Sequence, residues 1–324
     1  MIQRAIKWMS FLGILVVMHA CESRNSAVPT VGFVDAFEDN TIEQAKQGFI
    51  DALQKNGFDE QKKTVNIIYR NAQGNPPTLT QIVKYFVSEK VDLIATNPSL
   101  ATITAIQNTK DIPVFMMVSP TPALMKVTDS AGAPPKNLFG VADELDYIDT
   151  SFALIGSLIK PASGQLTVGM IYNQSEPQSV EALKRIERLA GTLHYTLVSL
   201  PVNSSADAQL VTESLLNKHI DAFFANPDNT VFASFETIVR DCDKAHVPVF
   251  TSEAGLVARG AVAAYGADMY QWGYQAGEQA AQYLQHKSTQ GLHWEIVKLR
   301  KRVYNPEVAK RFQLVIPSGF QPIH

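Results

Sequence analysis

The feature that most constrains the fold is an alternation of apolar and amphipathic segments that starts at Thr30 and runs through the chain twice. Short runs rich in β-branched residues, typical of strands, are separated by segments with the apolar spacing of helices. Continuous apolar strands between amphipathic helices indicate parallel sheets that are covered on both faces. The expected strands are 30–34, 64–69, 91–96 and 112–118 in the first half, and 166–172, 196–202, 220–225 and 247–250 in the second.

Two such halves predict an α/β fold of two doubly wound parallel-sheet lobes. The segment 137–144, which follows two prolines and contains Gly140, is the expected first crossover between the lobes. A helix near 269–284 and a strand near 295–299 are expected to recross, which makes a multi-strand hinge. The expected boundaries are 30–140 plus about 266–290 for lobe one, and 141–265 plus about 291–324 for lobe two.

Two helix starts carry a capping pattern. Thr41 with Gln44, and Thr78 with Gln81, each fit a capping box, in which a hydroxyl residue precedes a glutamine by three positions. Gly57 fits the C-terminal cap of the first of these helices. The pattern therefore predicts that Thr41 and Thr78 cap the helices that follow them.

The N-terminus has the pattern of an export signal, with basic residues before an apolar stretch over 8–18 that is too short to span a membrane stably. Cys21 follows the small residue Ala20, which resembles the lipobox of bacterial lipoproteins, whose cysteine is diacylated. We expect an exported protein of the cell envelope, lipid-anchored to a membrane on its periplasmic or outer face. The alternative is cleavage near Ala20 that leaves a soluble protein. The expected segments are a signal peptide over 1–20 and a lipid-anchored tether over 21–29.

The charge balance of the chain limits the classes of partner that it is expected to bind. The chain has 28 lysine and arginine residues against 31 aspartate and glutamate residues, a net charge of −3 without a long basic run, so nucleic acid is not an expected partner. Apart from Cys21 the only cysteine is Cys242, so we expect no intrachain disulfide and a small buried role for Cys242. Beyond the N-terminal segment, no apolar run is long enough for a transmembrane helix.

Ligands of open parallel sheets bind beyond the carboxyl ends of the strands, where the following helices begin. The loops expected there carry hydroxyls, amides, aromatic rings and carboxylates, but no lysine, arginine or histidine. Hydroxyls and backbone N–H groups suit a carboxylate and Asp228 suits an ammonium, so the set favours a zwitterion or polar metabolite over a polyanion. The simpler alternative is that residues such as Ser99 and Thr121 only cap helices. The residues expected to contact the ligand are Asp35, Phe37, Asn97, Ser99, Ser119, Thr121, Tyr172, Asn173, Asp228, Asn229 and Glu253.

Short motifs in both halves are shared with one family. They are Gln47–Phe49, Tyr69–Gly74, Val91–Ile94, Lys110–Val114, Val168–Gly169, Tyr172–Asn173, Asp228–Val231, Val247–Phe250 and Arg259–Ala261. Together, over most of the chain from about residue 31 to about residue 318, they resemble the substrate-binding lipoproteins of ABC importers of the tryptophan/tyrosine-binding type. That family has the type I periplasmic-binding-protein fold.

The resemblance implies that a small amino-acid-like ligand bridges two lobes, that closure about the hinge is stabilised, and that the closed form docks on an ABC permease. By residue match it adds Ser179, at a helix start, to the expected ligand contacts. It also implies ligand loops at Asn97 and Ser99 and an amino-group partner in Asp228.

The chain departs from the family pattern in the expected pocket. Residues 35–38 are Asp-Ala-Phe-Glu where the family has a His-Pro pair, and residues 119–121 are Ser-Pro-Thr where it has Thr-Asp-Pro. Gln178 replaces a common asparagine. These changes leave room for a ligand other than the usual one.

The main alternative is an extracytoplasmic ligand-sensing receptor that is not coupled to transport, because the same fold binds signals elsewhere. We expect no enzyme, since no nucleophile elbow, phosphate loop or dinucleotide fingerprint is present. The scattered histidines lack metal-ligand spacing, so no metal and no cofactor is expected. The acid pairs 38–39 and 143–144 are interpreted as solvated loop charge, and the basic run 298–302 as a strand end and a solvated turn.

Overall fold

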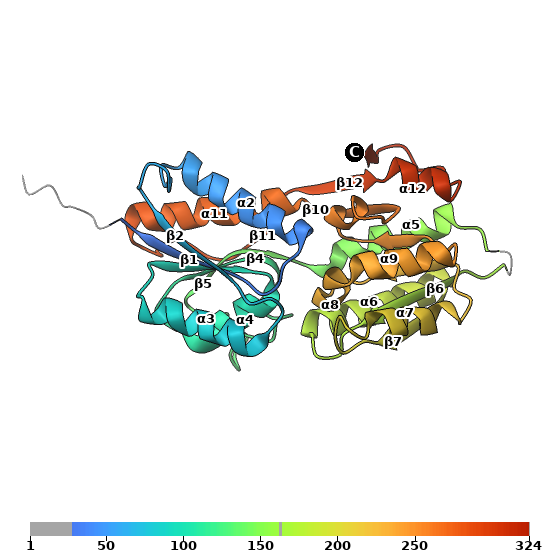
Figure 1. Cartoon of the computed structure of the whole chain (residues 1–324), viewed down its shortest axis with the longest axis horizontal. Helices are drawn as coiled ribbons and strands as arrows, with labels where there is room; N and C mark the ends of the chain where they lie inside the picture. The colour runs from blue at the N-terminus through green and yellow to red at the C-terminus, as the bar shows by residue number, and fades with distance from the viewer. Residues whose placement is uncertain (1–27, 162–163, 324) are drawn as a thin grey trace, which may run out of the picture.

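The computed structural model describes residues 28–161 and 164–323, and it shows two α/β lobes side by side along the long axis of the molecule (Figure 1). The chain begins in lobe one, crosses to lobe two after its fifth strand, returns for one long helix and an edge strand, and ends in lobe two. The expectation of two doubly wound parallel-sheet lobes is confirmed. The signal peptide and Cys21 lie outside the described residues.

Lobe one is built on a six-stranded sheet in which all neighbouring strands are parallel. Its order, β11-β5-β4-β3-β1-β2, reverses between β1 and β3, which is the switch point of a doubly wound sheet. The central strands are buried on both faces, which explains their continuous apolar sequence. The strands are β1 (Thr30–Asp35), β2 (Asn66–Asn71), β3 (Leu93–Asn97), β4 (Val114–Pro120), β5 (Leu138–Asp143) and β11 (Glu295–Ile296).

Four helices cover the two faces of this sheet, two on each side, as Figure 1 shows. On one face α2 (Asn40–Lys55) packs along α11 (Met269–His286), and on the other α3 (Pro76–Ser88) packs beside α4 (Ser99–Asn108). Glycines bring α2 and α11 together backbone to backbone. A Cβ on Gly273 would lie 1.8 Å from the carbonyl oxygen of Ala45, so residues 269–286 form an integral layer of lobe one.

The predicted capping boxes are wrong, because residues upstream supply the acceptors. Helix α2 is capped by Asp39, whose Oδ1 accepts from the N–H groups of Thr41 at 2.8 Å and Ile42 at 3.0 Å. Helix α3 is capped by Asn75, which accepts from the N–H of Thr78 at 2.9 Å. Aspartate and asparagine are among the strongest N-cap residues, and each outcompetes the threonine that follows it.

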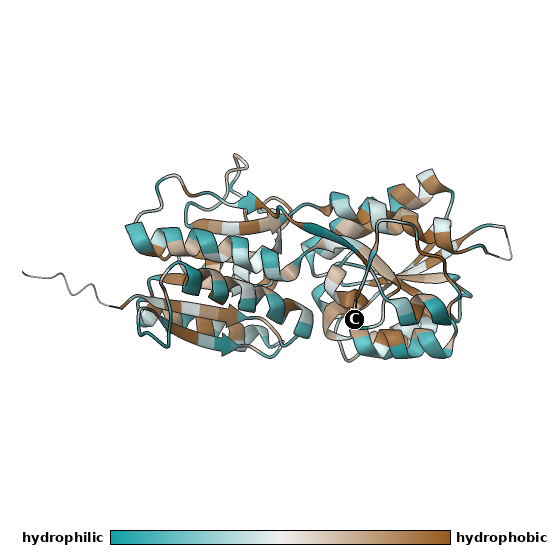
Figure 2. Ribbon diagram, turned by 90° about the horizontal axis from the view of Figure 1, so that it is seen from above, coloured by the Kyte–Doolittle hydropathy of each residue, from teal (hydrophilic) through white to brown (hydrophobic). Residues whose placement is uncertain are grey.

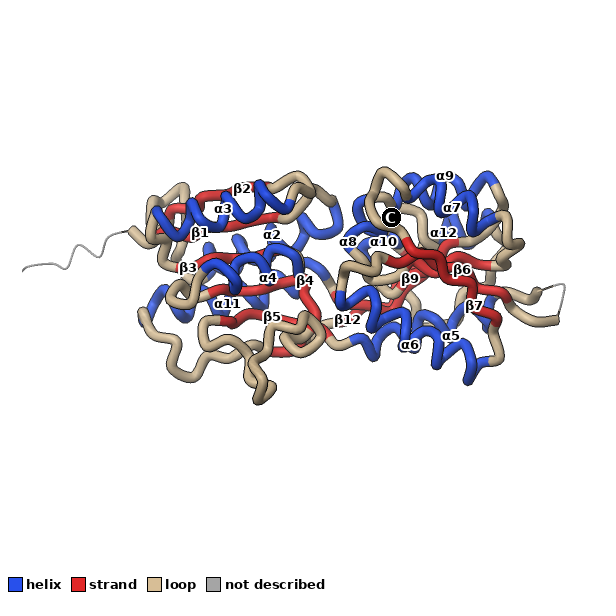
Figure 3. The backbone as a smooth tube through the Cα atoms, turned by 90° about the horizontal axis from the view of Figure 1, so that it is seen from below, coloured by secondary structure: helices blue, strands red, loops and turns tan. Residues whose placement is uncertain are grey.

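Lobe two has a four-stranded parallel sheet in the order β7-β6-β8-β9, with a second switch point between β6 and β8. Helices α5 and α6 lie on one face of this sheet and α7 and α9 on the other, as Figure 3 shows. The strands are β6 (Thr167–Tyr172), β7 (Thr196–Pro201), β8 (Ala222–Ala225) and β9 (Val249–Thr251). The helices are α5 (Ile148–Leu158), α6 (Pro177–Leu193), α7 (Ala208–Leu216), α8 (Asn229–Ala233), α9 (Phe235–Lys244) and α10 (Ala254–Val257).

A small third sheet completes lobe two. In it β10 (Ala263–Ala267) pairs antiparallel with β12 (Arg300–Tyr304), which in turn pairs with β13 (Gln321–Pro322). The interpretation of the basic run 298–302 as a strand end and a solvated turn is wrong for the backbone from Arg300 onward, although the Lys301 and Arg302 side chains are exposed. Residues from Arg300 form β12, and the Arg300 side chain is mostly buried against Asp143.

Three segments connect the lobes: β5 to the 3-10 turn Leu145–Tyr147, β10 to α11, and β11 to β12. The boundary expected at 291 is wrong, because Glu295 and Ile296 pair with Val141 and Ala142 at the edge of the lobe-one sheet. Strand β5 likewise keeps residues 141–143 in lobe one.

The core consists of two clusters of buried apolar side chains. One fills lobe one and continues into the α7/α9 side of lobe two, and the other fills the α5/α6 side of lobe two. Figure 2 shows the hydrophobic residues along the strands and the hydrophilic ones on the outward turns of the helices. The buried apolar side chains of the two lobes are therefore continuous on the α7/α9 side of lobe two.

Candidate functional site: a cleft between the lobes

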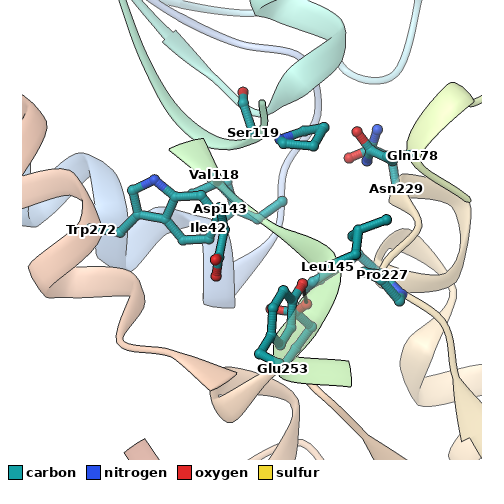
Figure 4. A pocket seen from close by; sticks show the side chains of 13 residues that line it. Ile42, Val118, Ser119, Asp143, Leu145, Gln178, Pro227, Asn229, Glu253 and Trp272 are labelled. Carbon is teal, nitrogen blue, oxygen red and sulfur yellow. Dashed lines mark hydrogen bonds between the residues drawn. The ribbon is translucent and has the colours of Figure 1, made fainter. Parts of the chain in front are cut away.

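Two adjoining cavities lie between the lobes, one near the hinge with a volume of about 40 Å³ and one further out with a volume of about 380 Å³. Both are bordered by Gln178 and Asn229, so they are the inner and outer compartments of one cleft. The inner cavity, shown in Figure 4, is lined by Ile42, Val118, Ser119, Pro120, Asp143, Leu145, Tyr147, Gln178, Pro227, Asn229, Phe232, Glu253 and Trp272. The outer cavity is lined by Phe37, Gly74, Pro76, Ser99, Leu100, Ile103, Asn173, Ser175, Glu176, Pro177, Gln178, Asn203, Ser204, Ser205, Asn229, Thr230 and Ala233.

Two carboxyl groups line the inner cavity, one from each lobe. Asp143 ends strand β5, and Glu253 precedes α10. They are only 2% and 3% exposed, and this burial raises the pKa of each to about 7. The positive charge of Arg300 partly lowers both pKa values. Repulsion from Glu253 raises the pKa of Asp143 further. A cation entering the cavity would favour the ionised form of both groups.

Each carboxyl has one fixed partner. Tyr147 donates its hydroxyl to Glu253 Oε1 at 2.6 Å, and Arg300 donates to Asp143 Oδ1. The Arg300 guanidinium also lies 5.4 Å from the centre of the Tyr147 ring, which links the two pairs. Asp143 Oδ2 is buried without a hydrogen-bond partner among the described residues. Because an unsatisfied buried acceptor is costly, a donor in the cavity would gain by pairing with it.

The rest of the inner wall is largely apolar. Trp272 comes from the first turns of α11, and its indole N–H donates to the carbonyl oxygen of Val141 at 2.8 Å, which fixes the ring. Ile42 comes from α2, and Phe232 from α8 on the opposite lobe. Aromatic and aliphatic walls with a few placed polar groups are typical of small-molecule sites.

The N-terminal ends of helices from both lobes border the outer cavity. Helix α4 starts at Ser99 and α6 starts at Pro177, and neither N-cap residue, Pro98 or Glu176, makes a side-chain cap hydrogen bond to its helix. Ser99, Leu100 and Gln178 line the cavity at these starts. Free N–H groups and the positive end of the helix dipole favour a carboxylate at such a position.

One amide joins the lobes across the outer part of this cleft. Asn229 Nδ2 lies 3.3 Å from Ser99 Oγ in the other lobe. Glu176 holds Asn229 in place by accepting from its backbone N–H at 3.0 Å and from its side-chain amide at 2.8 Å. Burial, with repulsion from Asp228, raises the pKa of Glu176 to about 8. Asn229 therefore links the two lobes at a point that borders both compartments.

The twelve side chains expected from the sequence divide into two groups of six. The first group lines the cleft, at the ends of the strands where parallel-sheet topology placed them. Ser119 and Glu253 line the inner cavity, Phe37, Ser99 and Asn173 line the outer one, and Asn229 lines both.

The second group lies close by, outside the lining of either cavity. Asp35 and Asn97 are buried at the lobe-one switch point, where Asn97 Nδ2 donates to Asp35 Oδ1 at 3.0 Å. Ser179 and Asp228 form a similar buried pair in lobe two, with Ser179 Oγ 2.6 Å from Asp228 Oδ2. Thr121 accepts from the N–H of Leu124 at 3.4 Å, and Tyr172 is partly buried in the lobe-two core.

Asp228 is fully buried and its carboxylate is already satisfied. Oδ1 accepts from the N–H groups of Thr230 and Val231, as the N-cap of α8, and Oδ2 accepts from Ser179 and from the N–H of Asn173. The structure therefore gives Asp228 a positioning role at the wall of the cleft.

Several lining residues have no counterpart in the sequence expectations, among them Asp143, Tyr147 and Trp272, whereas Gln178 lines both cavities as its place in the expected pocket implied. The interpretation of 143–144 as solvated charge is wrong for Asp143, which is buried at the hinge, and that of 38–39 is wrong for Asp39, which caps α2. An aspartate directly after an apolar strand was the available signal for Asp143. Trp272 and Tyr147 depend on how the hinge segments return to the cleft, which the local sequence pattern does not reveal.

Within residues 28–161 and 164–323, no group of three or more histidine, cysteine, aspartate or glutamate side chains is arranged to hold a metal ion. None of the helices in this part of the chain has the length and apolar character needed to cross a bilayer.

Two switch points that face each other across a cleft define the class of two-lobed solute-binding proteins. The chain belongs to the ABC transporter substrate-binding protein family, whose model matches residues 30–320. This is a family of extracytoplasmic binding proteins rather than of enzymes, and the protein is the solute-binding component of an ABC importer. The resemblance noted in the sequence is thereby confirmed.

Similar proteins include one curated relative and several solved structures. A tyrosine-binding protein of Clostridioides difficile (strain R20291) is 31% identical over 258 residues, which cover 80% of this chain and 73% of the relative. A crystal structure of a conserved domain protein from Vibrio cholerae superposes with a TM-score of 0.83 at 27% identity, over 91% of this chain and 99% of that one. An ABC domain from Streptococcus pneumoniae in complex with L-Trp superposes with a TM-score of 0.82 at 21% identity, over the same shares.

Proposed function

We propose that the protein captures an amino-acid-like ligand in the cleft, with the ligand's ammonium at Asp143 and Glu253 and its carboxylate at the uncapped helix starts of the outer cavity. The observation that carries the proposal is the pair of buried carboxyl groups, one from each lobe, in a cavity that no lysine or arginine lines. A cationic nitrogen there would relieve the repulsion between the two groups and satisfy Asp143 Oδ2.

The relatives support an amino acid with an aromatic side chain. One is a tyrosine-binding protein, and one structure contains L-Trp. The cleft of this chain offers Trp272, Tyr147 and Phe232 on its inner wall and Phe37 on its outer wall. Flat apolar surfaces of this kind suit a ring, so L-tyrosine and L-tryptophan are the first ligands to test.

The cleft contains residues from both lobes, so a ligand in it contacts both and stabilises their closed arrangement. Capture and release involve no covalent change. The ligand's ammonium would bind one carboxyl from each lobe, so an amine bound to one lobe alone would pair with only one of the two carboxyl groups.

A thermal-shift and calorimetric panel tests the ligand class. We expect L-tyrosine or L-tryptophan to raise the melting temperature in a concentration-dependent way, and their deaminated analogues, the arylpropionates, to have no effect. The variants Asp143→Asn and Glu253→Gln should weaken binding at least tenfold, whereas Glu187→Gln, on an exposed turn of α6, should not. Equal binding of the deaminated analogues would contradict the assignment of the carboxyl pair.

We also propose that residues 1–20 are removed on export and that Cys21 carries the lipid anchor, so that the cleft operates outside the cytoplasm close to its permease. The basic and apolar segments before Cys21 support this. Metabolic labelling with a palmitate analogue tests it. Label should appear on the wild-type protein and be lost in Cys21→Ser, and an unlabelled wild-type protein would favour simple cleavage near Ala20.

A further inference from the structure

A charged contact joins the lobes at the edge of the cleft. Arg259, in the turn after α10 of lobe two, donates to Asp39 of lobe one, and it lies 3.3 Å from Thr41 Oγ1 of the same lobe. Neither Arg259 nor Asp39 lines either cavity. The two side chains are 13% and 1% exposed, so this is a largely desolvated ion pair rather than a surface one.

Lobe two holds Arg259 ready for this contact. Glu236 accepts from Arg259 Nε at 2.7 Å and from Nη2 at 2.9 Å, and the carbonyl oxygen of Phe232 accepts from Nη2 at 2.9 Å. The guanidinium also lies 5.4 Å from the centre of the Phe235 ring. These partners all belong to lobe two, so they fix the arginine whether or not lobe one is near.

Lobe one holds Asp39 in a matching way. Its Oδ1 caps α2 through the N–H groups of Thr41 and Ile42, which leaves Oδ2 for Arg259. The surfaces around the pair meet closely, since a Cβ on Gly255 would lie 2.0 Å from Thr41 Cγ2. The charges therefore pair only when the lobes are fully together.

The ion pair is connected to the inner cavity on both sides. Asp39 caps the helix that carries Ile42, and Arg259 binds the carbonyl of Phe232. The side chains of Ile42 and Phe232 both line the inner cavity. The residues that form the ion pair are thus connected, one in each lobe, to side chains that line the inner cavity.

We propose that Asp39 and Arg259 form an interlobe latch, outside the ligand contacts, that stabilises the closed form and slows ligand release. The bond between Asp39 and Arg259 joins the two lobes and is lost when they separate, so the latch favours the closed state alone and shifts the population toward it. Arg259 does not contact the ligand; it acts on the lobe arrangement through Asp39. Of the two effects, only the slower ligand release rests on the proposed function.

The test measures lobe separation and ligand release separately. Spin labels at Lys84→Cys on α3 and Gln209→Cys on α7, both exposed, report the distance between the lobes by pulsed electron resonance without any ligand. The variants are Arg259→Gln and Asp39→Asn, the second of which keeps an N-cap acceptor for α2. The control is Arg185→Gln, which removes an arginine–aspartate pair with Asp149 inside lobe two.

We expect both latch variants to increase the long-distance population at least twofold, and the double variant to add little to either single one. Stopped-flow release of L-tyrosine should be about tenfold faster in both, with the control like the wild type in both measurements. Distance distributions that match the wild type, or an equal shift in Arg185→Gln, would overturn the latch. If L-tyrosine does not bind the wild type, the proposed ligand is wrong, and the ligand-free distances still decide on the latch.

Discussion

Tyr147 donates its hydroxyl to Glu253 across 2.6 Å inside the inner cavity, and both side chains are almost completely buried. The hydrogen bond favours the ionised carboxyl, but burial outweighs it and raises the pKa of Glu253 to about 7. The protein thus keeps a carboxyl group that titrates close to neutral pH in the place where a ligand would bind. Such a group costs stability and is typical of functional sites.

Replacing Glu253 by glutamine should therefore stabilise the ligand-free protein at high pH. A raised folded-state pKa means that the carboxyl's contribution to stability is fully present below its unfolded pKa, near 4.5, and is lost as the pH rises through 7. We expect the free energy of unfolding of Glu253→Gln to exceed that of the wild type by about 2 kcal/mol at pH 8 and to differ little from it at pH 4.5. Chemical denaturation at both pH values measures this, and a variant less stable than the wild type at pH 8 would contradict it.

Ligand binding should have the opposite pH dependence. Protons compete with a cationic ligand for Asp143 and Glu253, whose pKa values are both raised to about 7 by burial. We expect the affinity for L-tyrosine to fall about tenfold between pH 7.5 and pH 5.5, because the carboxyl groups must be ionised to bind an ammonium. Calorimetry at the two pH values checks this. The residual binding of the double variant Asp143→Asn/Glu253→Gln should be independent of pH over this range.

Asp228 offers a test between direct contact and positioning. Asp228→Ala removes a cap and a buried network, and should cost about 2–4 kcal/mol of stability as well as affinity. Asp228→Asn keeps an N-cap acceptor but no charge. If Asp228 only positions Asn173 and α8, the asparagine variant should retain measurable binding. Complete loss of binding in Asp228→Asn, with the fold intact by circular dichroism, would instead support a direct contact with the ammonium.

The contact between α2 and α11 should tolerate no side chain at Gly273. A Cβ there would meet the Ala45 carbonyl oxygen at 1.8 Å, so Gly273→Ala must push the helices apart and should cost about 3 kcal/mol or more. Gly191→Ala is the matched control, because an added Cβ in α6 has nothing within 4 Å. Helix propensity should make that variant about 0.5–1 kcal/mol more stable. Equal effects in the two variants, measured by thermal unfolding, would contradict the close packing.

Cys242 should be chemically inert in the folded protein. It is fully buried in α9, and burial, with help from neighbouring aspartates, raises the pKa of its thiol well above the usual range. Because the thiolate is the reactive form, a thiol reagent should label Cys242 in Cys21→Ser only after denaturation. Labelling within minutes under native conditions would show that α9 opens easily.

The sequence predicts the fold well because its signals are local. Apolar strands and amphipathic helices are continuous along the chain, and parallel topology then places residues such as Ser99, Asn229 and Glu253 at one edge. The sequence predicts the cleft less well, because a carboxylate that follows a strand can either cap the next helix or face the ligand cavity. Asp228 is followed by backbone N–H groups that it caps, whereas Glu253 is left facing the cavity. Asp143 and Trp272 reach the site through hinge segments whose paths depend on long-range packing.

The late arrival of α11 and β11 in lobe one has a consequence for biosynthesis. The main sheet of lobe two comes from one continuous stretch, 167–251, but the first lobe lacks one of its four covering helices and an edge strand until residues 269–296 have been made. The segment that emerges first is therefore among the last to become stable. Export before folding would keep lobe one from closing around an incomplete sheet, because its last helix and edge strand are supplied only after lobe two has been made.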